Sequence, residues 1–231
     1  METVLITGAN KGIGLELVRG FAASGRRVIA GCRAPGEAQA LQALASSNDA
    51  IEVHEVHVSD GDSVAKLAAR IGEGPIDVLI NNAGMAGPDF QNQSLGDMDY
   101  EGWAETFAVN TMAPLRVLQT FRSNLAAGTN PRAVTVTSQM GAIGLDMPVM
   151  LAYCSSKGAV NKVMRLAAPE LAQQGIAVAL LHPGFVQTDM GGPSAHITAE
   201  ESAAGMIAVI DGLTLADSPC FKTWEGKDHV W

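Results

Sequence analysis

Two residues of the sequence, Tyr153 and Lys157, have the types and the spacing of an acid–base pair. They lie four positions apart in a stretch with helical periodicity, so their side chains share one face of a helix. A tyrosine hydroxyl has a pKa of about 10, but a neighbouring ammonium group favours the phenolate and lowers that pKa. Ser138, at the expected tip of a strand, could hold a substrate oxygen beside the tyrosine. Taken alone, however, the pair is better explained as a half-buried tyrosine beside a solvated lysine.

A second group, the glycines of the segment VLITGANKGIG (residues 4–14), could bind an anion. Gly8, Gly12 and Gly14 lie between an apolar strand and an expected helix. Glycine lets the backbone turn tightly and approach a ligand closely, and the free N–H groups at the start of the helix favour a phosphate. Ordinary turn glycines are the alternative, because one GxxxGxG pattern by itself is weak evidence.

The segments that must position these residues alternate between strands and helices. Most of the apolar, β-branched runs are continuously apolar, as expected for strands covered on both faces of a parallel sheet. The runs are 3–7, 27–32, 51–56, 76–81, 132–138 and 176–182. With helical stretches between them, we expect one dinucleotide-binding and catalytic domain over residues 1–231. Its fold class is α/β, a single-domain Rossmann fold whose doubly wound, mostly parallel sheet has about seven strands.

Helical periodicity is clearest over residues 12–25, 62–72, 98–128 and 151–175. Asp62 is the expected N-cap of the second stretch, and Gly72 is its expected end. Pro114 predicts a local distortion within the third stretch, and Pro169 predicts a kink near the end of the fourth. We expect a further helix to begin near Thr198.

Polar and glycine-rich segments gather where the expected strands end. Cys32–Arg33 follows the second strand, NNAG (81–84) the fourth, Thr137–Ser138 the fifth and HPGFVQTDM (182–190) the sixth. Ligands of such sheets bind beyond the carboxyl ends of the strands, near the point where the strand order reverses. This clustering therefore predicts a binding site at that edge.

Composition restricts the class of partner. Hydrophobic residues make up 47% and charged residues 17% of the chain, which is typical of a folded protein with a sizeable core. The formal net charge of −9 disfavours nucleic acid as the main partner. Three widely spaced cysteines indicate reduced thiols in a cytoplasmic protein, and the histidines have no metal-ligand spacing, so no metal is expected. We see no signal peptide and no apolar stretch of membrane-helix length, and therefore expect no membrane partner.

Together, these motifs resemble those of the short-chain dehydrogenase/reductase family over essentially the full chain. TGANKGIG resembles the TGxxxGxG turn of the family, and NNAG its motif after the fourth strand. HPGFVQTDM resembles its PG segment, and the C-terminal part resembles a C-factor-like carbonyl reductase branch. The residues that match the catalytic tetrad of the family, in order and spacing, are Asn110, Ser138, Tyr153 and Lys157.

The resemblance implies hydride transfer between a nicotinamide cofactor and a carbonyl or alcohol carbon. Tyr153 would be the general acid that protonates the developing alkoxide, and Ser138 would position the carbonyl oxygen. Lys157 would lower the tyrosine pKa and hold the nicotinamide ribose. Asn110 would bend the long helix locally and anchor a proton-relay water.

The resemblance also implies a set of cofactor contacts. Thr188 would hold the carboxamide, with Pro183 and Gly184 shaping that wall, while Asn82 and Ala83 would lie along the adenosine. The expected cofactor-binding residues are Gly8, Asn10, Lys11, Gly12, Ile13, Gly14, Arg33, Val58, Asn82, Ala83, Gly84, Tyr153, Lys157, Pro183, Gly184, Val186 and Thr188. The family often has Asp-Val where this chain has His57-Val58, so an adenine-side hydrogen bond could be lost or replaced.

The choice of cofactor depends on Lys11 and Arg33. Sites that prefer NAD(H) usually place an acidic residue after the second strand, whereas an arginine there suits a 2′-phosphate. This chain has Cys32 at that position, followed by Arg33. We therefore expect Lys11 and Arg33 to bracket one phosphate, so that NADP(H) is preferred and NAD(H) is the alternative. Two solvent-exposed cations without a ligand are the other interpretation.

The sequence leaves alternatives open for the substrate, for the oligomeric state and for whether the protein is an enzyme. Only residues 191–197 separate Met190 from the next expected helix, which predicts an open site for varied small or flat carbonyl compounds. Its expected lining is Met85, Met140, Met147, Phe185 and Met190, although several of these could be core residues. Helices 98–128 and 151–172 could form the interface of a homodimer or homotetramer. The rival functions are a dinucleotide-binding signalling protein with little turnover and, less favoured, a dehydratase or isomerase on the same fold.

Overall fold

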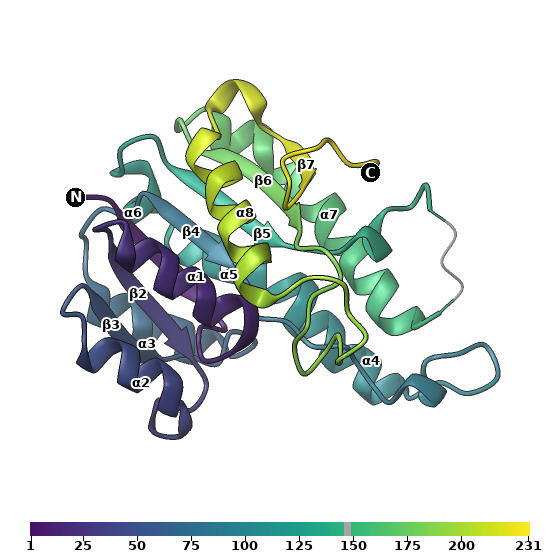
Figure 1. Ribbon diagram of the computed structural model, residues 1–231. Helices are drawn as coiled ribbons and strands as arrows, with labels where there is room; N and C mark the ends of the chain where they lie inside the picture. Colours follow the sequence, from purple (N-terminus) through teal and green to yellow (C-terminus); the bar gives the residue numbers. More distant parts are fainter. Residues whose placement is uncertain (146–148) are drawn as a thin grey trace.

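Seven parallel strands form one sheet at the centre of the computed structural model, which describes residues 1–145 and 149–231 (Figure 1). The spatial order is β3-β2-β1-β4-β5-β6-β7. The strands are β1 (Thr3–Thr7), β2 (Arg27–Cys32), β3 (Ile51–Glu55), β4 (Val78–Asn81), β5 (Arg132–Val136), β6 (Ala177–His182) and β7 (Cys220–Thr223). This order confirms the predicted doubly wound α/β sheet. Six strands match the predicted runs to within a few residues, and β7 is the strand for which no run was identified.

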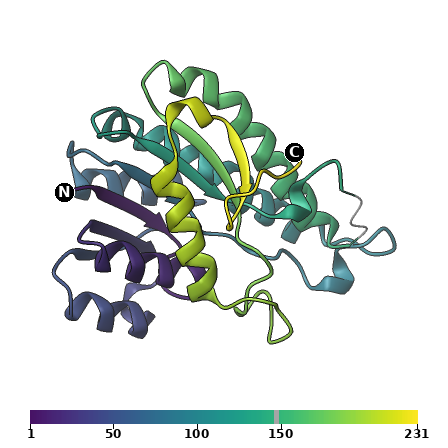
Figure 2. The same cartoon turned by 45° about the horizontal axis from the view of Figure 1, so that its top comes forward.

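Helices cover both faces of the sheet, as the apolar strands require. Figure 1 shows α1 and α8 crossing the near face, and the turned view in Figure 2 shows the same layer. One face carries α1 (Gly12–Ala23), α2 (Gln39–Ser46) and α8 (Ala199–Gly212). The other carries α3 (Gly61–Ile71), α5 (Ala113–Thr120), α6 (Arg122–Ala126) and α7 (Leu151–Ala172), with α4 (Tyr100–Phe107) packed on α7. Side chains alternate along each strand, so Val4 and Ile6 enter one core while Leu5 enters the other.

The predicted helix boundaries need two corrections. Asp60, not Asp62, caps α3: its side chain accepts a 2.9 Å hydrogen bond from the Asp62 N–H, while Gly72 ends the helix as expected with φ of 72°. The 98–128 stretch is not one helix but is divided into α4, a π-helical turn η3 (Ala108–Met112), α5 and α6. Pro169, by contrast, lies inside α7, which continues to Ala172. Short 3-10 helices are η1 (Pro35–Glu37), η2 (Phe90–Asn92), η4 (Gln139–Gly141) and η5 (Leu215–Asp217).

The strand order reverses at β1, which pairs with β2 on one side and β4 on the other. Val4 lies opposite both Val28 of β2 and Val78 of β4. The connections from β1 and β4 therefore leave toward opposite faces, and a crevice for a ligand opens at their carboxyl ends. Gly8 directly follows β1 and Asn82 directly follows β4, so the glycine turn and the NNAG segment lie at this crevice.

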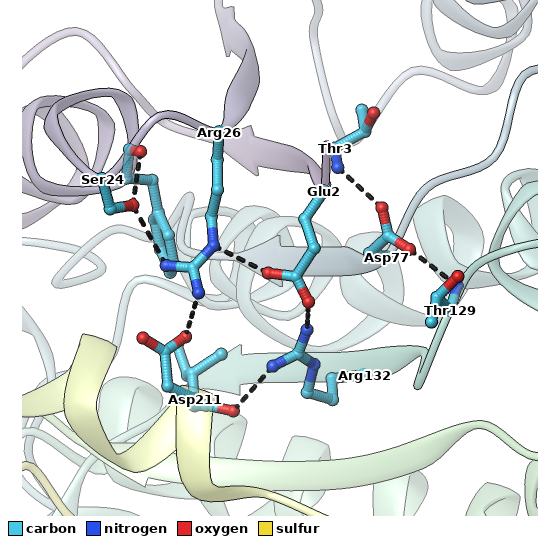
Figure 3. A network of polar contacts seen from close by, with 10 residues as sticks. Glu2, Thr3, Ser24, Arg26, Asp77, Thr129, Arg132 and Asp211 are labelled. Carbon is cyan, nitrogen blue, oxygen red and sulfur yellow. Dashed lines mark hydrogen bonds and ion pairs between the residues drawn. The ribbon is translucent and has the colours of Figure 1, made fainter.

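A network of charged residues lies at the amino-terminal ends of the strands, opposite the crevice (Figure 3). Glu2 accepts hydrogen bonds from Arg26, at 2.7 Å, and from Arg132, at 2.5 Å. Arg26 also pairs with Asp211 of α8 at 2.9 Å. Arg132 is 2% exposed and also donates to the Ile210 carbonyl. The network joins β1, β5 and α8 far from the crevice, which indicates a structural role.

Candidate active site

The glycine turn has a conformation that only glycine adopts easily. Gly8 and Gly12 have φ of 67° and 54°. A Cβ on Gly8 would lie 2.8 Å from the Ala83 Cα, and one on Gly14 would lie 2.2 Å from the Gly8 carbonyl oxygen. The first N–H groups of a helix have no intrahelical partner. In α1 the N-cap residue, Lys11, makes no side-chain capping bond to them either. This arrangement suits a bound phosphate.

The NNAG segment holds this turn in place. The Asn82 amide nitrogen donates to the carbonyls of Thr7 and Gly8, at 3.1 and 3.0 Å. The Thr7 hydroxyl oxygen accepts from the backbone N–H groups of Asn82 and Ala83. Gly84 lies further along: a Cβ there would be 3.5 Å from the Lys157 Nζ. Asn82 therefore supports the glycine turn directly. From the sequence we expect it only to lie along the adenosine.

Ser138, Tyr153 and Lys157 meet at the end of β5. Ser138 follows the strand and caps η4, where its Oγ accepts from the Met140 N–H at 3.1 Å. The Tyr153 and Lys157 side chains share one face of α7, with the Lys157 Nζ 5.8 Å from the centroid of the tyrosine ring. Lys157 Nζ donates to the Val136 carbonyl at 3.0 Å. The predicted trio thus comes from two segments that the sheet brings together.

Burial dominates the electrostatics of this trio. It raises the pKa of Tyr153 to about 12, although a hydrogen bond with Ser138 acts in the opposite direction. It also lowers the pKa of Lys157 to about 8. The pKa of Tyr153 is therefore above its ordinary value, and Lys157 is not among the causes of the shift, so the expected lowering by Lys157 stays a prediction. The loss of water around both groups outweighs any stabilisation of the phenolate by the ammonium.

Asn110 lies in the π-helical turn η3, where the predicted distortion of the long helix occurs. Its Oδ1 accepts from the Met85 N–H at 2.9 Å, and its Nδ2 donates to the Met85 carbonyl and to the Ser156 Oγ. Ser156 is the neighbour of Lys157 in α7, and its hydroxyl donates to the Tyr153 carbonyl. Asn110 therefore joins the loop after β4 to the turn of α7 that carries Tyr153 and Lys157.

The segment after β6 closes the other side of the crevice. Thr188 lies over the glycine turn, because a Cβ on Gly12 would be 3.1 Å from the Thr188 Cγ2. Gly184 has φ of 87°, and Val186 is buried and bridges to Ile197. The Pro183 carbonyl accepts from Ser202 of α8 at 2.6 Å. The backbone of this segment is thereby fixed close to the turn.

The two expected phosphate ligands, Lys11 and Arg33, have different surroundings in the described residues. Lys11 Nζ forms an ion pair with Asp189 at 2.6 Å, and both side chains are largely exposed. Arg33 is exposed after β2 and makes no side-chain hydrogen bond or ion pair within the described ranges 1–145 and 149–231. Asp189 could not be predicted as the partner of Lys11, because an exposed residue 178 positions away leaves no local pattern.

Val58 is less accessible than expected for a cofactor contact. Its side chain is 9% exposed and belongs to the core under α3 and α5, and its carbonyl accepts from Arg116 at 3.4 Å. The His57 N–H donates to the Ser63 Oγ, and its ring lies 3.7 Å from Glu55. Tyr153, also an expected contact, is 9% exposed as well, so Val58 stays an expected cofactor contact.

Sequence reasoning missed several residues that position the site. A Cβ on Gly141 would be 2.6 Å from the Lys157 carbonyl carbon, so glycine lets η4 pack against α7. Asn161, 4% exposed, accepts from the Thr137 hydroxyl at 2.6 Å and donates to the Gly141 carbonyl. Gln93, 1% exposed, contacts the Tyr153 backbone. Only the spacing of Asn161, four residues after Lys157 on the same helix face, was visible in the sequence.

Of the expected substrate-lining residues, Phe185 and Met190 are about half exposed, at 45% and 52%. The Phe185 ring packs edge-on against His196 at 5.4 Å. Met85 and Met140 are partly buried. Met147 lies outside the described residues. In the described part of the chain, no helix is both long and apolar enough to cross a membrane.

Comparisons with known proteins agree with this geometry. The model of the short chain dehydrogenase family matches residues 2–197. The C-signal protein of Myxococcus xanthus is 42% identical over 166 residues, which cover 71% of this chain and 98% of that protein. A 1-hydroxy-2-glutathionyl-2-methyl-3-butene dehydrogenase of Rhodococcus sp. (strain AD45) is 34% identical over the whole of both chains.

A solved structure extends the likeness to the fold. The NADPH-bound carbonyl reductase from chicken fatty liver superposes with a TM-score of 0.93 at 33% identity. The alignment covers 100% of this chain and 99% of that one. The family model spans most of the chain, and the relatives align along its length. The chain belongs to the short chain dehydrogenase family.

Proposed function

We propose that the protein is an NADP(H)-dependent oxidoreductase that reduces an aldehyde, ketone or quinone to an alcohol, or catalyses the reverse reaction. The observation that carries the proposal is the meeting of Ser138, Tyr153 and Lys157 beside the glycine turn, at the edge of the sheet where such ligands bind. The NADPH-bound carbonyl reductase at 33% identity supports the choice of cofactor and of reaction.

The residues present fit a dinucleotide. The uncapped start of α1 and glycines with no room for a Cβ suit the diphosphate. Arg33 and Lys11 are the cations for a 2′-phosphate, Lys11 after release from Asp189. The other proposed contacts are Gly8, Asn10, Gly12, Ile13, Gly14, Val58, Asn82, Ala83, Gly84, Tyr153, Lys157, Pro183, Gly184, Val186 and Thr188. Bound NADPH supplies the hydride.

The electrostatics favour Tyr153 as a proton donor. With a pKa of about 12, its phenol is protonated at neutral pH. An alkoxide is a stronger base than a phenolate, so the proton moves to the developing alkoxide as the carbonyl carbon receives hydride. Ser138 acts on the phenol closely enough to lower its pKa, and we assign it the role of orienting the carbonyl oxygen. In the reverse direction Tyr153 must first lose its proton, so alcohol oxidation should accelerate with rising pH.

Lys157 and Asn110 support this proton transfer. Lys157 is placed by its bond to Val136 to hold the nicotinamide ribose, and its pKa of about 8 lets it exchange a proton near neutral pH. Both amide hydrogens of Asn110 are used by Met85 and Ser156. If Asn110 anchors a relay water, its backbone carbonyl in the π-helical turn is therefore the better candidate.

The short segment after Met190 supports broad substrate specificity. The α8 helix begins at Ala199 with Thr198 as N-cap, so no long helical lid lies between Met190 and α8. Phe185 and Met190 are exposed rather than buried in the core, and methionine adapts its shape to different ligands. A panel of aldehydes, ketones and quinones with NADPH, followed at the nicotinamide absorbance, tests this point. High activity on a single compound would contradict it.

A second candidate is a dinucleotide-binding regulatory protein with little turnover. The 42% identity to the C-signal protein is the observation that favours it. Binding alone, however, does not require a tyrosine acid beside an orienting serine.

Tyr153→Phe separates the two functions. The substitution removes only the hydroxyl, so kcat should fall by about 10²- to 10⁴-fold, the usual contribution of a positioned acid. The NADPH Kd should change little, because Lys157 and the glycine turn remain. Thermal unfolding must stay cooperative, as in the parent. Equal turnover in both proteins, or none in the parent across the panel, would favour the regulatory function.

We also propose that residues 1–231 act as one domain, since a single sheet contains strands from Thr3 to Thr223. Assembly through helices 98–128 and 151–172 into a homodimer or homotetramer, and a place in the cytoplasm, stay predictions. Met112 and Leu166, 51% and 66% exposed, are apolar residues on these helices that such an interface would cover. Light scattering of the purified protein measures the assembly.

A further inference from the structure

The helix that carries Tyr153 begins without a local cap. Met150, the residue before α7, has left-handed backbone angles (φ 50°, ψ 56°) and makes no side-chain capping bond. The first N–H groups of a helix have no intrahelical partner and must find one elsewhere. Tyr153 is the third residue of α7, so the position of its ring depends on how this first turn is held.

One residue from a distant loop supplies the missing acceptors. The backbone carbonyl of Gln93 accepts from the Leu151 N–H at 3.1 Å. Its side-chain Oε1 accepts from the Tyr153 N–H at 3.2 Å. Gln93 is 1% exposed, so these bonds are shielded from water. It is separated from Tyr153 by 60 positions and acts as a cap provided by another part of the fold.

The other end of the Gln93 side chain fixes its orientation. Nε2 donates to the carbonyls of Ala86 and Pro88, at 3.0 and 2.5 Å. Two carbonyls on one side and an N–H group on the other allow only one assignment of the amide oxygen and nitrogen. The amide therefore bridges the loop after β4 and the catalytic helix.

The loop that carries Gln93 is itself held in place. Gln93 pairs with Met98 in an antiparallel bridge, and the Asp99 N–H donates to the Asn92 carbonyl. This hairpin leads into α4, whose Trp103 donates from Nε1 to the Ser155 Oγ of α7 at 3.0 Å. The segment from Gln93 to α4 thus contacts α7 both at its first turn, through Gln93, and at Ser155, through Trp103.

We infer that Gln93 is a positioning residue for the proton donor, acting through the backbone of Tyr153 rather than on substrate. The inference rests on the proposed function, because it matters only if Tyr153 transfers a proton. A displacement of about 1 Å in a reacting group can slow catalysis about 10²-fold. Loss of the Gln93 bridge should therefore lower kcat while leaving the cofactor site unchanged.

The test compares Gln93→Met with a matched variant, Asn124→Leu. Both substitutions keep the approximate shape of a buried side chain and remove an amide that bridges two loop carbonyls. Asn124 is 8% exposed and donates to the carbonyls of Gly72 and Gly74, at 2.8 and 2.7 Å, far from the crevice. Both variants should lower Tm. Only Gln93→Met should lower kcat, by about 10- to 100-fold, with an unchanged NADPH Kd.

An isotope effect adds a readout that loss of stability alone would not move. With NADPH deuterated at C4, the primary isotope effect on kcat should be larger for Gln93→Met than for the parent, because a misplaced acid makes the chemical step more rate-limiting. Parent-like kcat in Gln93→Met, or an equal loss in Asn124→Leu, would overturn the inference.

If Gln93→Met does not fold, Gln93→Asn provides the test: its amide is one methylene too short to reach both the loop carbonyls and Tyr153, so kcat should fall at least tenfold. Parent-like kcat there overturns the inference. If the parent shows no turnover that depends on Tyr153, the proposed function fails and this inference fails with it. Parent turnover with an unaffected Gln93 variant refutes the positioning role alone.

Discussion

Lys157 should reduce the stability of the protein at neutral pH. Its side chain is 5% exposed, and its ammonium has one carbonyl, that of Val136, as its hydrogen-bond partner in the described residues. Burial lowers its pKa from the ordinary value of 10.5 to about 8. At about 1.36 kcal/mol per pKa unit, this shift corresponds to about 3 kcal/mol of free energy of unfolding. Replacing Lys157 with methionine should remove that cost.

The sign and the pH window follow from proton binding. Between about pH 8 and 10.5 the unfolded chain binds more protons at Lys157 than the folded chain does, so the stability of the parent rises with pH in this window. Below pH 8 the full cost is present. Lys157→Met also loses the bond to Val136, worth about 1 kcal/mol. At pH 7 the variant should therefore be more stable by about 2 kcal/mol, and its Tm higher by about 4–8 °C.

The assay is urea denaturation of both proteins from pH 7 to 10.5. The stability of Lys157→Met relative to the parent should fall by about 3 kcal/mol over this range, so the variant should be less stable than the parent by about 1 kcal/mol at pH 10.5. Tyr153, whose pKa is raised to about 12 by burial, is present in both proteins, so its titration cancels in the difference. Lys162→Met, at an exposed position of the same helix, is the control and should show no such change. A stability difference independent of pH, or a less stable Lys157→Met at pH 7, would refute the reasoning. Turnover should be lost in Lys157→Met whatever its stability.

Three other predictions concern the cofactor and the charged network. Arg33→Ala should weaken NADPH binding tenfold or more and leave NADH binding nearly unchanged, because it removes a charge-assisted bond to the 2′-phosphate; equal losses for both cofactors would contradict this. Asp189→Asn should instead tighten NADPH binding by releasing Lys11, as measured by fluorescence titration. Glu2→Gln should lower the free energy of unfolding by about 2–4 kcal/mol in urea denaturation, since Arg132 is buried and loses its counter-charge. A loss below about 1 kcal/mol would show that the network contributes little.

The fold was predictable because its signals are local. Each strand buried on both faces is a continuous apolar run, and polar or glycine residues follow the strand ends. The alternation of strands and helices, and the end of the sheet that carries the site, can therefore be inferred without long-range information. The error at α3 has a local cause as well. Asp60 and Asp62 are two residues apart, and either can cap a helix, so only the observed bond from Asp62 N–H to Asp60 distinguishes them. The strand β7 has four residues, as β4 does, but only Cys220 and Phe221 are buried and Lys222 and Thr223 follow them, so it has no continuous apolar run.

The residues that support the site were not predictable in the same way. Gln93 contacts Tyr153 across 60 positions, and Asp189 contacts Lys11 across 178. Neither residue type is unusual in its segment, and neither occurs at a spacing that indicates a partner. The sequence could identify the residues with chemical function, because their types are informative. It could not identify the residues that hold them, because those are defined by the folded backbone.

The protonation states of Tyr153 and Lys157 could not be predicted from the sequence, because they depend on burial. From spacing alone, Lys157 and Tyr153 form a pair in which the cation lowers the phenol pKa. That argument assumes that both groups stay hydrated, whereas Tyr153 and Lys157 are 9% and 5% exposed. In this environment each charged form is disfavoured, so the tyrosine keeps its proton and the lysine gives up its proton more easily. A neutral phenol that is held in place and ready to donate is the state that carbonyl reduction requires. The same burial thus accounts for both the instability expected from Lys157 and the direction of proton transfer proposed for Tyr153.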